Sequence, residues 1–156
     1  MGYRLALVGG SDIICLNNTV GSPRTLALVD GPLSYDAYLD AIRRGRTAVA
    51  GKKHNRMDMR VDGARLGSEI TLAEPSDLTI DIDSELEEAA TAQILVNGIA
   101  VRELALPAGP HLERTTVRAE RSSWISARTR RVQTSAVYAI LAGHPIRASA
   151  SRRLVS

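Results

Sequence analysis

The sequence predicts an α+β protein, in which a short α/β segment at residues 1–51 precedes an antiparallel β-sandwich at 52–150 and a tail at 151–156. The first observation is an amphipathic helical pattern within residues 34–45. The second is a change, after Gly51, to short stretches that alternate apolar and polar residues, which is typical of half-buried strands. Because turn signals separate these stretches and no further helical pattern follows, they favour a sandwich of antiparallel strands.

The composition limits the kinds of site that this chain can hold by itself. Of its 156 residues, 44% are apolar and 24% are charged, which is typical of a globular chain. A single cysteine, Cys15, excludes a disulfide framework and any zinc site made of several cysteines. Since the three histidines are far apart in the sequence, the composition favours a scaffold, or one piece of an enzyme, over a complete enzyme.

The sequence predicts no membrane segment and no targeting signal. No apolar run approaches the roughly 18 to 20 residues that a membrane helix needs, so no membrane partner is expected. The apolar run at residues 5–8 is also too short for the core of a signal peptide, which slightly favours the cytoplasm.

Basic residues gather in the last third of the chain. Between His111 and Ser156 there are nine arginines and two glutamates, whereas the whole sequence has a net charge of +3. Such a stretch could meet nucleic acid or another anionic surface. The simpler explanation is the solvated outer face of a sheet, and without a nucleic-acid-binding motif we do not favour nucleic acid as the partner.

Two apolar runs predict strands in the first segment. Residues 4–8 form a run that ends at Gly9-Gly10, as expected for a buried strand that opens into a loop. Residues 24–30 predict a second strand, closed by Gly31-Pro32. An exposed apolar edge near these strands would favour docking with a partner or self-association.

The clearest predicted element is a helix that begins after Ser34. The Ser34 hydroxyl can accept a free backbone N–H of the first turn, and Gly45 can end the helix in the left-handed conformation. Asp36 and Arg43 have the charges that suit the two ends of the helix dipole. The apolar stripe of the helix comprises Tyr35, Tyr38, Leu39 and Ile42.

Recognisable turns separate the strands of the predicted sandwich. Asp62-Gly63 predicts a tight turn after a strand at 57–61, and Asn97-Gly98 predicts a hairpin within 92–104. Trp124 lies in an alternating stretch and is expected to anchor the core. Further strands are predicted at 78–83, 112–120, 122–130 and 134–141, with a last short segment at 146–148.

Asp12 is the first candidate for chemistry, because it follows a predicted strand and the glycines of Gly9-Gly10. A carboxylate just past the carboxyl end of a buried strand is where α/β barrels place catalytic and metal-binding residues. An Asp in such a loop can equally cap the turn through its own backbone. Cys15 follows closely, as a ligand, a nucleophile or, more simply, a small buried apolar residue.

Other candidate residues carry positive charge. Arg24 and Arg46 could bind an anionic substrate group, or could be surface ion-pair partners. His54 lies in a short basic run that could contact phosphate or simply form an exposed connector. His111 and His144 are expected in loops, and neither has a second ligand at the spacing that a metal site requires.

Several short segments, taken in order, resemble a known family. They are Gly-Gly-Ser-Asp at 9–12, Val-Gly-Ser-Pro-Arg-Thr at 20–25, the stretch 33–47 around the helix, Arg-Met-Asp-Met-Arg-Val-Asp-Gly at 56–63, Ser-Ser-Trp-Ile-Ser-Ala-Arg at 122–128 and Gln-Thr-Ser-Ala-Val-Tyr at 133–138. Their order and spacing resemble the C-terminal part of the CehA/McbA-type metallohydrolases, relatives of the polymerase-and-histidinol-phosphatase (PHP) domain superfamily.

The resemblance implies a distorted α/β barrel whose His and Asp side chains bind divalent metals such as Zn, Mn or Fe. A metal-bound hydroxide would then attack a phosphoester, carbamate or amide bond. The position that matches the family's last metal-ligand motif is Asp12. Where many members have a His two residues later, this chain has Ile14, and a late motif that often reads His-Thr is here Gln133-Thr134. The family's other histidine ligands would precede Met1, so this chain holds at most one ligand.

These implications lead to one expected function and one alternative. We expect residues 1–51 to be the last strand and helix of a PHP-like barrel, and the chain to be a C-terminal fragment or degenerate relative of a metal-dependent hydrolase. It should be inactive alone, because a catalytic metal needs about three protein ligands. Its partner would be a missing N-terminal barrel segment or a second copy. The alternative is a non-catalytic sandwich that binds another protein; with five aromatic residues in all, sugar binding is less favoured.

Overall fold

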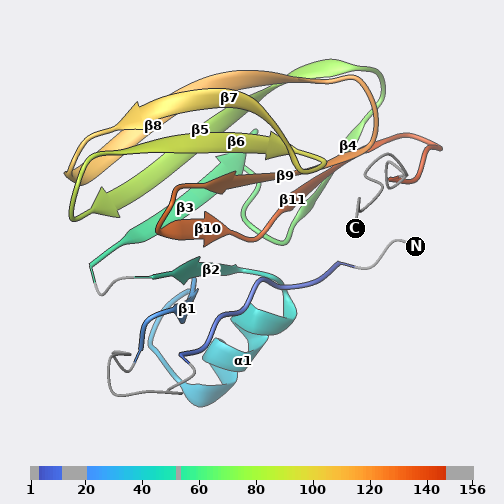
Figure 1. Ribbon diagram of the computed structural model, residues 1–156. Coiled ribbons are helices and arrows are strands. Elements are labelled where there is room, and N and C mark those ends of the chain that lie inside the picture. Colours follow the sequence, from blue (N-terminus) through green and yellow to red (C-terminus); the bar gives the residue numbers. More distant parts are fainter. Residues whose placement is uncertain (1–3, 12–20, 52–53, 147–156) are drawn as a thin grey trace, which may run out of the picture.

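The computed structural model describes residues 4–11, 21–51 and 54–146, and these residues are mostly in β-strands. They form one helix, α1 (Tyr35–Arg43), and two sheets in a β-sandwich-like arrangement (Figure 1). The small sheet has the strand order β3-β5-β8 and comprises β3 (Arg56–Val61), β5 (Ser76–Leu86) and β8 (Gly109–Ala119). The large sheet comprises β1 (Arg24–Ala27), β2 (Thr47–Ala50), β4 (Glu69–Leu72), β6 (Ala90–Val96), β7 (Ile99–Leu106), β9 (Ser123–Arg128), β10 (Val132–Thr134) and β11 (Val137–Leu141).

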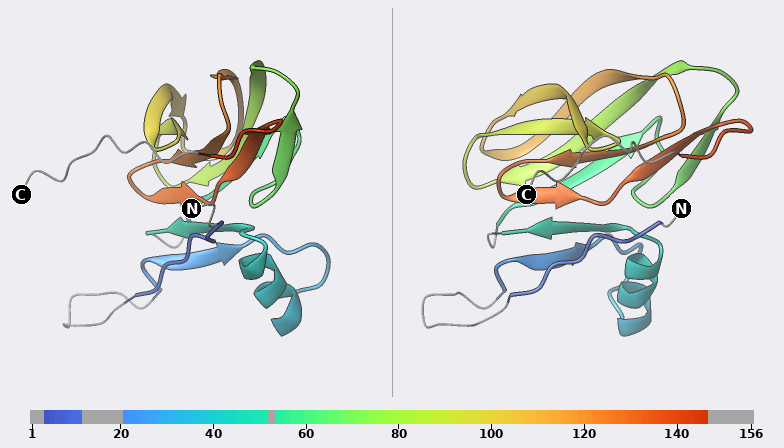
Figure 2. Two further views of the ribbon diagram at one scale, coloured as in Figure 1. Left: turned by 90° about the vertical axis from the view of Figure 1, so that its right-hand side faces the viewer. Right: turned by 45° about the vertical axis from the view of Figure 1, so that its right-hand side comes forward.

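The large sheet joins the N-terminal part of the chain to the sandwich. Strand β2 pairs on one side with β1 and on the other with β10, so residues from both predicted segments share one sheet. Helix α1 and residues 4–11 lie at the β1–β2 end of this sheet, away from the small sheet (Figure 2). We call residues 4–11 and 21–51 the N-terminal unit.

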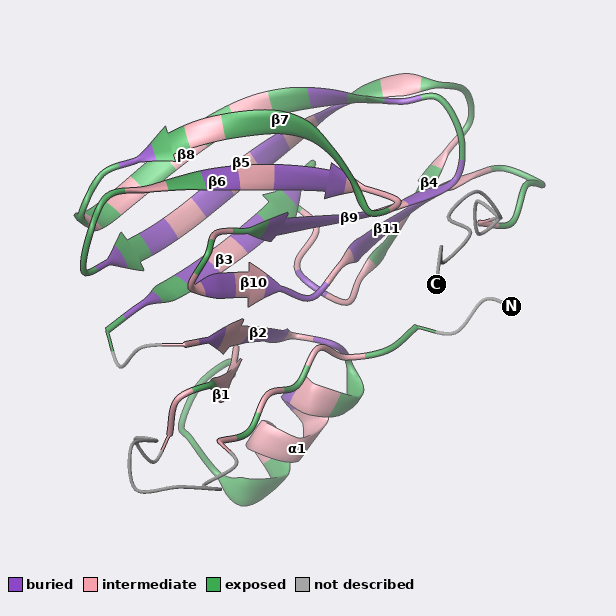
Figure 3. Cartoon of the chain, viewed as in Figure 1, coloured by how far each residue is buried: buried purple, intermediate pink, exposed green. Residues whose placement is uncertain are grey.

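The core lies between the two sheets, because alternate residues of each strand point inward. On the small sheet, Met59, Ile80 and Ile82 are fully buried, and on the large sheet Ile94 and Ile125 face them in the same apolar cluster. Strand β5 changes between buried and less buried colours along its length (Figure 3). The alternation predicted for residues 78–83 is therefore confirmed.

The predicted helix is confirmed with its capping residues. The Ser34 hydroxyl accepts the Ala37 N–H at 3.1 Å, which satisfies one of the free donors of the first turn. The Arg44 N–H donates to the Asp40 carbonyl, and Gly45 follows in the left-handed region with φ of +67°.

Both predicted tight turns are also confirmed. Asp62 and Gly63 have φ of +47° and +77°, and Asn97 and Gly98 have φ of +51° and +84°. Positive φ at both central residues is what a two-residue hairpin turn requires, and Asn-Gly and Asp-Gly tolerate it best. The second of these turns joins β6 to β7.

Some strand predictions are wrong. Residues 4–8 form no strand, and Leu5 and Val8 are exposed rather than buried. The predicted strand at 134–141 is split into β10 and β11, while β2 and β4 were not predicted at all. His111 belongs to β8 rather than to a loop. Most of the predicted segment at 146–148 lies outside the described residues.

The large sheet is mixed rather than purely antiparallel. Strand β11 pairs with β4 in parallel, although its pairing with β9 is antiparallel. The two parallel strands come from distant parts of the chain, so no local turn signal could have predicted their pairing.

Trp124 does not anchor the core as expected. Its neighbours Ile125 and Ala127 point into the core, and the two-residue period of β9 therefore places Trp124 and Ser126 on the outer face of the large sheet. The Trp124 ring is half-buried there, and it packs near Gly98, where an added Cβ would lie 3.6 Å from the ring.

Residues 4–9 are held on the outer face of the large sheet by side-chain hydroxyls. The Leu7 N–H donates to Ser135 Oγ at 2.9 Å, and the Leu7 carbonyl accepts from Thr47 Oγ1 at 2.7 Å. Gly9 bonds to Thr25 Oγ1 through both its N–H and its carbonyl, each at 2.9 Å. A Cβ at Gly9 would lie 2.6 Å from Val49, so glycine allows this close approach.

Candidate functional site

One end of the large sheet gathers several of the residues that the sequence singled out. We call this end the loop cluster; it comprises Ser11, Gly21–Arg24, Gly51, His54–Asn55 and Thr129–Arg131. The Gly21 N–H donates to Ser11 Oγ at 3.1 Å, and the Ser22 hydroxyl donates to the Gly51 carbonyl. The Gly51 N–H in turn donates to the Arg131 carbonyl at 2.7 Å.

Asp12 and Cys15 lie outside the described residues. The two residues that flank their segment, Ser11 and Gly21, are hydrogen-bonded to each other within the loop cluster. Arg24 is also in the loop cluster, where it lies opposite Ala50 and its Nη1 is 3.5 Å from the Gly21 carbonyl.

His54 and Arg46 have different positions relative to this cluster. His54 belongs to the loop cluster and is exposed in the connector between β2 and β3. Arg46 precedes the other end of β2, so the structure does not bring it together with Arg24. Its guanidinium pairs instead with Asp30 at 2.9 Å.

Asp30 makes a structural ion-pair bridge rather than an open anion site. Arg65 and Arg46 both bind its carboxylate, and the hydrogen bond from Arg65 is the main reason that the pKa of Asp30 lies below its ordinary value. This bridge joins the turn after β1 to the turn after β3. Because all three side chains are partly exposed, its contribution to stability is modest.

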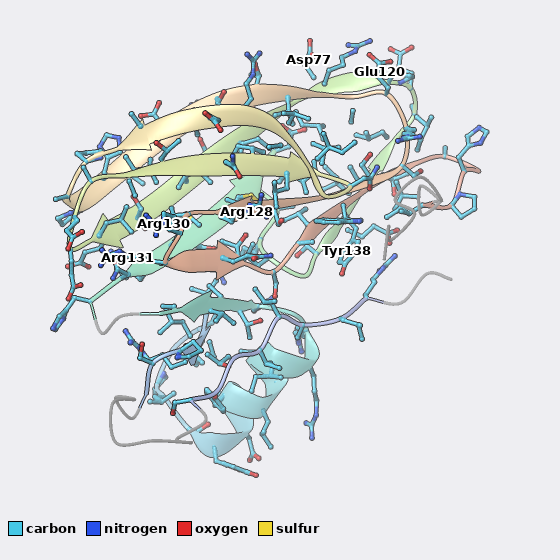
Figure 4. The ribbon with its side chains drawn as sticks, in the orientation of Figure 1. Asp77, Glu120, Arg128, Arg130, Arg131 and Tyr138 are labelled. Carbon is cyan, nitrogen blue, oxygen red and sulfur yellow. The ribbon has the colours of Figure 1, made fainter. Side chains whose placement is uncertain are left out.

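Sequence reasoning missed Arg131 and its partner. Arg131 Nη2 binds Glu88 at 2.7 Å, while Arg131 Nη1 is buried and bonds to no other described residue. Arg128, Arg130 and Arg131 lie around the turn between β9 and β10 (Figure 4). The clustering of three arginines within 128–131 was the available signal, but the approach of Glu88 depends on the tertiary fold.

The described residues do not by themselves form a metal site. Nowhere in 4–11, 21–51 and 54–146 do three His, Cys, Asp or Glu side chains gather as metal ligands would. His111 Nε2 approaches Glu113 Oε2 at 3.0 Å, but no third donor joins this pair among the residues described. The described residues alone therefore offer no set of three ligands for the divalent metal that the family resemblance implies, and Asp12, the expected ligand, lies outside them.

The arginines of β8 share one face, and their charges are matched. Arg114 binds Asp81 at 2.6 Å, and Arg118 approaches Asp77 at 3.7 Å and Glu120 at 3.2 Å. Figure 4 shows Asp77 and Glu120 at the same end of the small sheet. This outer face therefore carries both signs of charge rather than a purely basic patch.

A hollow of about 490 Å³ lies on the outer face of the small sheet, and sequence reasoning did not single it out. Asp58 lies directly opposite Asp83, and both line the hollow. Burial is the main cause that raises the pKa of Asp58, and the Met59 N–H, which donates to its Oδ1 at 2.7 Å, opposes the shift.

Replacing Asp58 with asparagine is expected to stabilise the protein at neutral pH. Because the pKa of folded Asp58 lies above the value of 3.8 for an ordinary Asp, ionisation destabilises the folded state as the pH rises through that raised pKa. The gain at pH 7 should be under about 1 kcal/mol, since the site is partly solvated. It should vanish below pH 3.8, where the carboxyl is protonated in both states. Urea unfolding of the variant and the wild type, at neutral pH and at a pH below 3.8, measures this difference in stability. Asp77→Asn on the neighbouring strand β5 is the control, and a larger gain at the acidic pH would contradict the prediction.

The fold and its surface features define a class: a β-sandwich-like protein with a small N-terminal unit that shares its large sheet. No protein-family model matches the chain, and no curated protein or solved structure matches it. No helix among the described residues is long and apolar enough to cross a membrane.

Proposed function

We propose that this chain is the C-terminal part of a PHP-type metal-dependent hydrolase of the phosphoester or carbamate/amide class, in which the N-terminal unit docks against a catalytic barrel. The sandwich supports that unit through the shared large sheet. In this proposal Asp12 contributes one metal ligand, the barrel supplies the others, and the chain alone has no hydrolase activity.

The observation that carries the proposal is the set of exposed apolar side chains in the N-terminal unit. Leu5, Val8, Leu33 and Tyr35 are 77%, 59%, 79% and 75% exposed, respectively. Four large apolar side chains left in water within one small unit are typical of a surface that another protein covers.

The backbone of residues 4–9 supports docking in the same place. Leu7 and Gly9 bond to hydroxyls of the large sheet, whereas no hydrogen bond from another described residue reaches the backbone of Ala6 or Val8. Since alternate backbone groups of an extended segment point in opposite directions, those of Ala6 and Val8 face away from the sheet. A strand of the barrel could pair with them.

The test is to express the chain together with the coding sequence that precedes it in the genome, and to measure bound divalent metal. We expect metal in the co-purified complex and its loss in the Asp12→Asn variant, because an amide is a weaker ligand than a carboxylate. Asp36→Asn, on the exposed side of the helix, is the matched control and should leave the metal content unchanged. A complex without metal, or an Asp12→Asn complex that keeps all of it, would refute the proposal.

A second candidate function is a non-catalytic module that binds another protein through the edge of β7. This strand pairs only with β6 among the described strands, and it exposes Ile99 and Val101, which are 56% and 45% accessible. Exposed apolar edges of this kind are templates for strand pairing with another chain. Size-exclusion chromatography distinguishes the two candidate functions. Self-association of the chain that is lost in the Val101→Lys variant supports the binding module. A monomer that binds only the barrel supports the hydrolase.

A further inference from the structure

A groove of about 530 Å³ crosses the outer face of the large sheet, beside residues 5–8. Its floor includes Trp124, Ser126 and Gln133, and Tyr138, which lies opposite Trp124 on β11, also lines it. The volume lies within the range of small-molecule sites, which are commonly apolar with a few polar groups. The groove is separate from the loop cluster, but residues 5–8 on its rim also belong to the surface that the proposed barrel would cover.

The walls of this groove carry no charged side chain. Although 24% of the residues in the sequence are charged, the lining consists of apolar, aromatic, hydroxyl and amide side chains. Arg4, which lies 5.2 Å from the Tyr138 ring centre, is itself paired with Glu69. A groove with such walls would desolvate a charged ligand without offering it a counter-charge, so the ligand that fits is neutral.

Some polar groups of the groove are free to bind a ligand, although Ser135 Oγ already bonds to Leu7 and Thr134 Oγ1 to Ala127. The Gln133 amide and the Trp124 Nε1–H make no hydrogen bond to another described residue. Neither group is fully buried, so both keep contact with solvent. Ser126 Oγ is buried at the floor without a hydrogen-bond partner in the described structure. A ligand that meets these groups needs both donors and acceptors.

Aromatic side chains are concentrated here. Of the five aromatic residues in the chain, Trp124 and Tyr138 both line this groove. The Trp124 ring is backed by the turn at Gly98, so it is held in place as a flat apolar surface. A ring with one apolar face can stack on it while hydroxyl groups at the ring edge reach Gln133.

We infer that this groove binds a neutral saccharide of one or two rings. The apolar face of one ring stacks on Trp124, and its hydroxyl groups exchange hydrogen bonds with Gln133 and, after rotation of its side chain, with Ser126. This inference uses no metal and does not require the proposed hydrolase function, and its test uses the chain alone because the groove shares residues 5–8 with the docking surface.

Intrinsic fluorescence tests the inference directly, because Trp124 is the single tryptophan of the chain. The probes are glucose and cellobiose as neutral sugars, glucuronate as the charged counterpart and indole as an apolar ring. A neutral sugar should shift the emission saturably, while glucuronate should bind at least about tenfold more weakly. Gln133→Leu should weaken the sugar about tenfold as well. Gln93→Leu, on the same sheet face but outside the groove, should bind like the wild type.

Three results would overturn the inference. The first is no saturable shift with either neutral sugar up to about 100 mM, a concentration at which even weak sites fill. The second is sugar binding of equal strength in the wild type and in Gln133→Leu, which would place the sugar elsewhere. The third is a saturable response to indole alone, which would make the groove a purely apolar pocket.

Discussion

Gly67→Ala should destabilise the protein by about 3 kcal/mol or more, since a side chain there meets backbone rather than a movable group. Gly67 has φ of +78°, and an added Cβ would lie 1.7 Å from the Arg44 carbonyl oxygen and 3.0 Å from the Gly45 carbonyl carbon. The C-terminal end of α1 would have to move away from the turn before β4. Equilibrium unfolding in urea measures the loss.

Gly63→Ala is the matched control for this substitution. Gly63 has nearly the same φ, +77°, but an added Cβ would meet no heavy atom within 4 Å. It should therefore carry only the cost of the left-handed conformation, about 1 kcal/mol. Equal losses of stability in the two variants would show that the contact with the Arg44 carbonyl adds nothing to the effect of Gly67→Ala. If α1 merely undocks, hydrogen exchange of its amides should rise in Gly67→Ala and stay unchanged in Gly63→Ala.

The elements that were predicted correctly have signals confined to a few neighbouring residues. The cap at Ser34, the turn at Asp62-Gly63 and the hairpin at Asn97-Gly98 each depend on local backbone chemistry. The alternation in β5 is long enough that its inward face could be predicted without knowing the partner strands.

The elements that were missed depend on partners far away in the sequence. Residues 5–8 have the apolar composition of a buried strand, but Ser135 and Thr47 hold their backbone where a neighbouring strand was expected. Strand β4 exists through parallel pairing with β11. Trp124 was assigned to the wrong face, because an alternating stretch with small residues on both sides does not reveal which face is buried.

The same distinction applies to the surface sites. Position 133 attracted interest in the sequence only as a departure from a family motif, where Gln replaces His. Its register opposite Val49 and Arg128 puts the amide on the outer face, beside Trp124 in the groove. Likewise, Arg131 and Glu88 are far apart in the sequence and meet only in the folded chain.

Ile80→Ala should remove about 3 kcal/mol of stability, within the usual range for truncating a fully buried aliphatic side chain. Ile80 is inaccessible to solvent, and it lies between Val61 on β3 and Thr115 on β8 at the centre of the small sheet. Truncation leaves a cavity among side chains that β-sheet hydrogen bonds hold in place, so the neighbours can relax only partly. The unfolding midpoint in urea measures the loss.

Leu112→Ala is the control, because it truncates a similar side chain on the same sheet that is 77% exposed. We expect a change within about 0.5 kcal/mol there. A small loss at Ile80 together with a large loss at Leu112 would mean that the inner and outer faces of the small sheet are exchanged. Since a shift of one residue in register moves every side chain to the other face, this pair of variants tests the register of the whole β3-β5-β8 sheet.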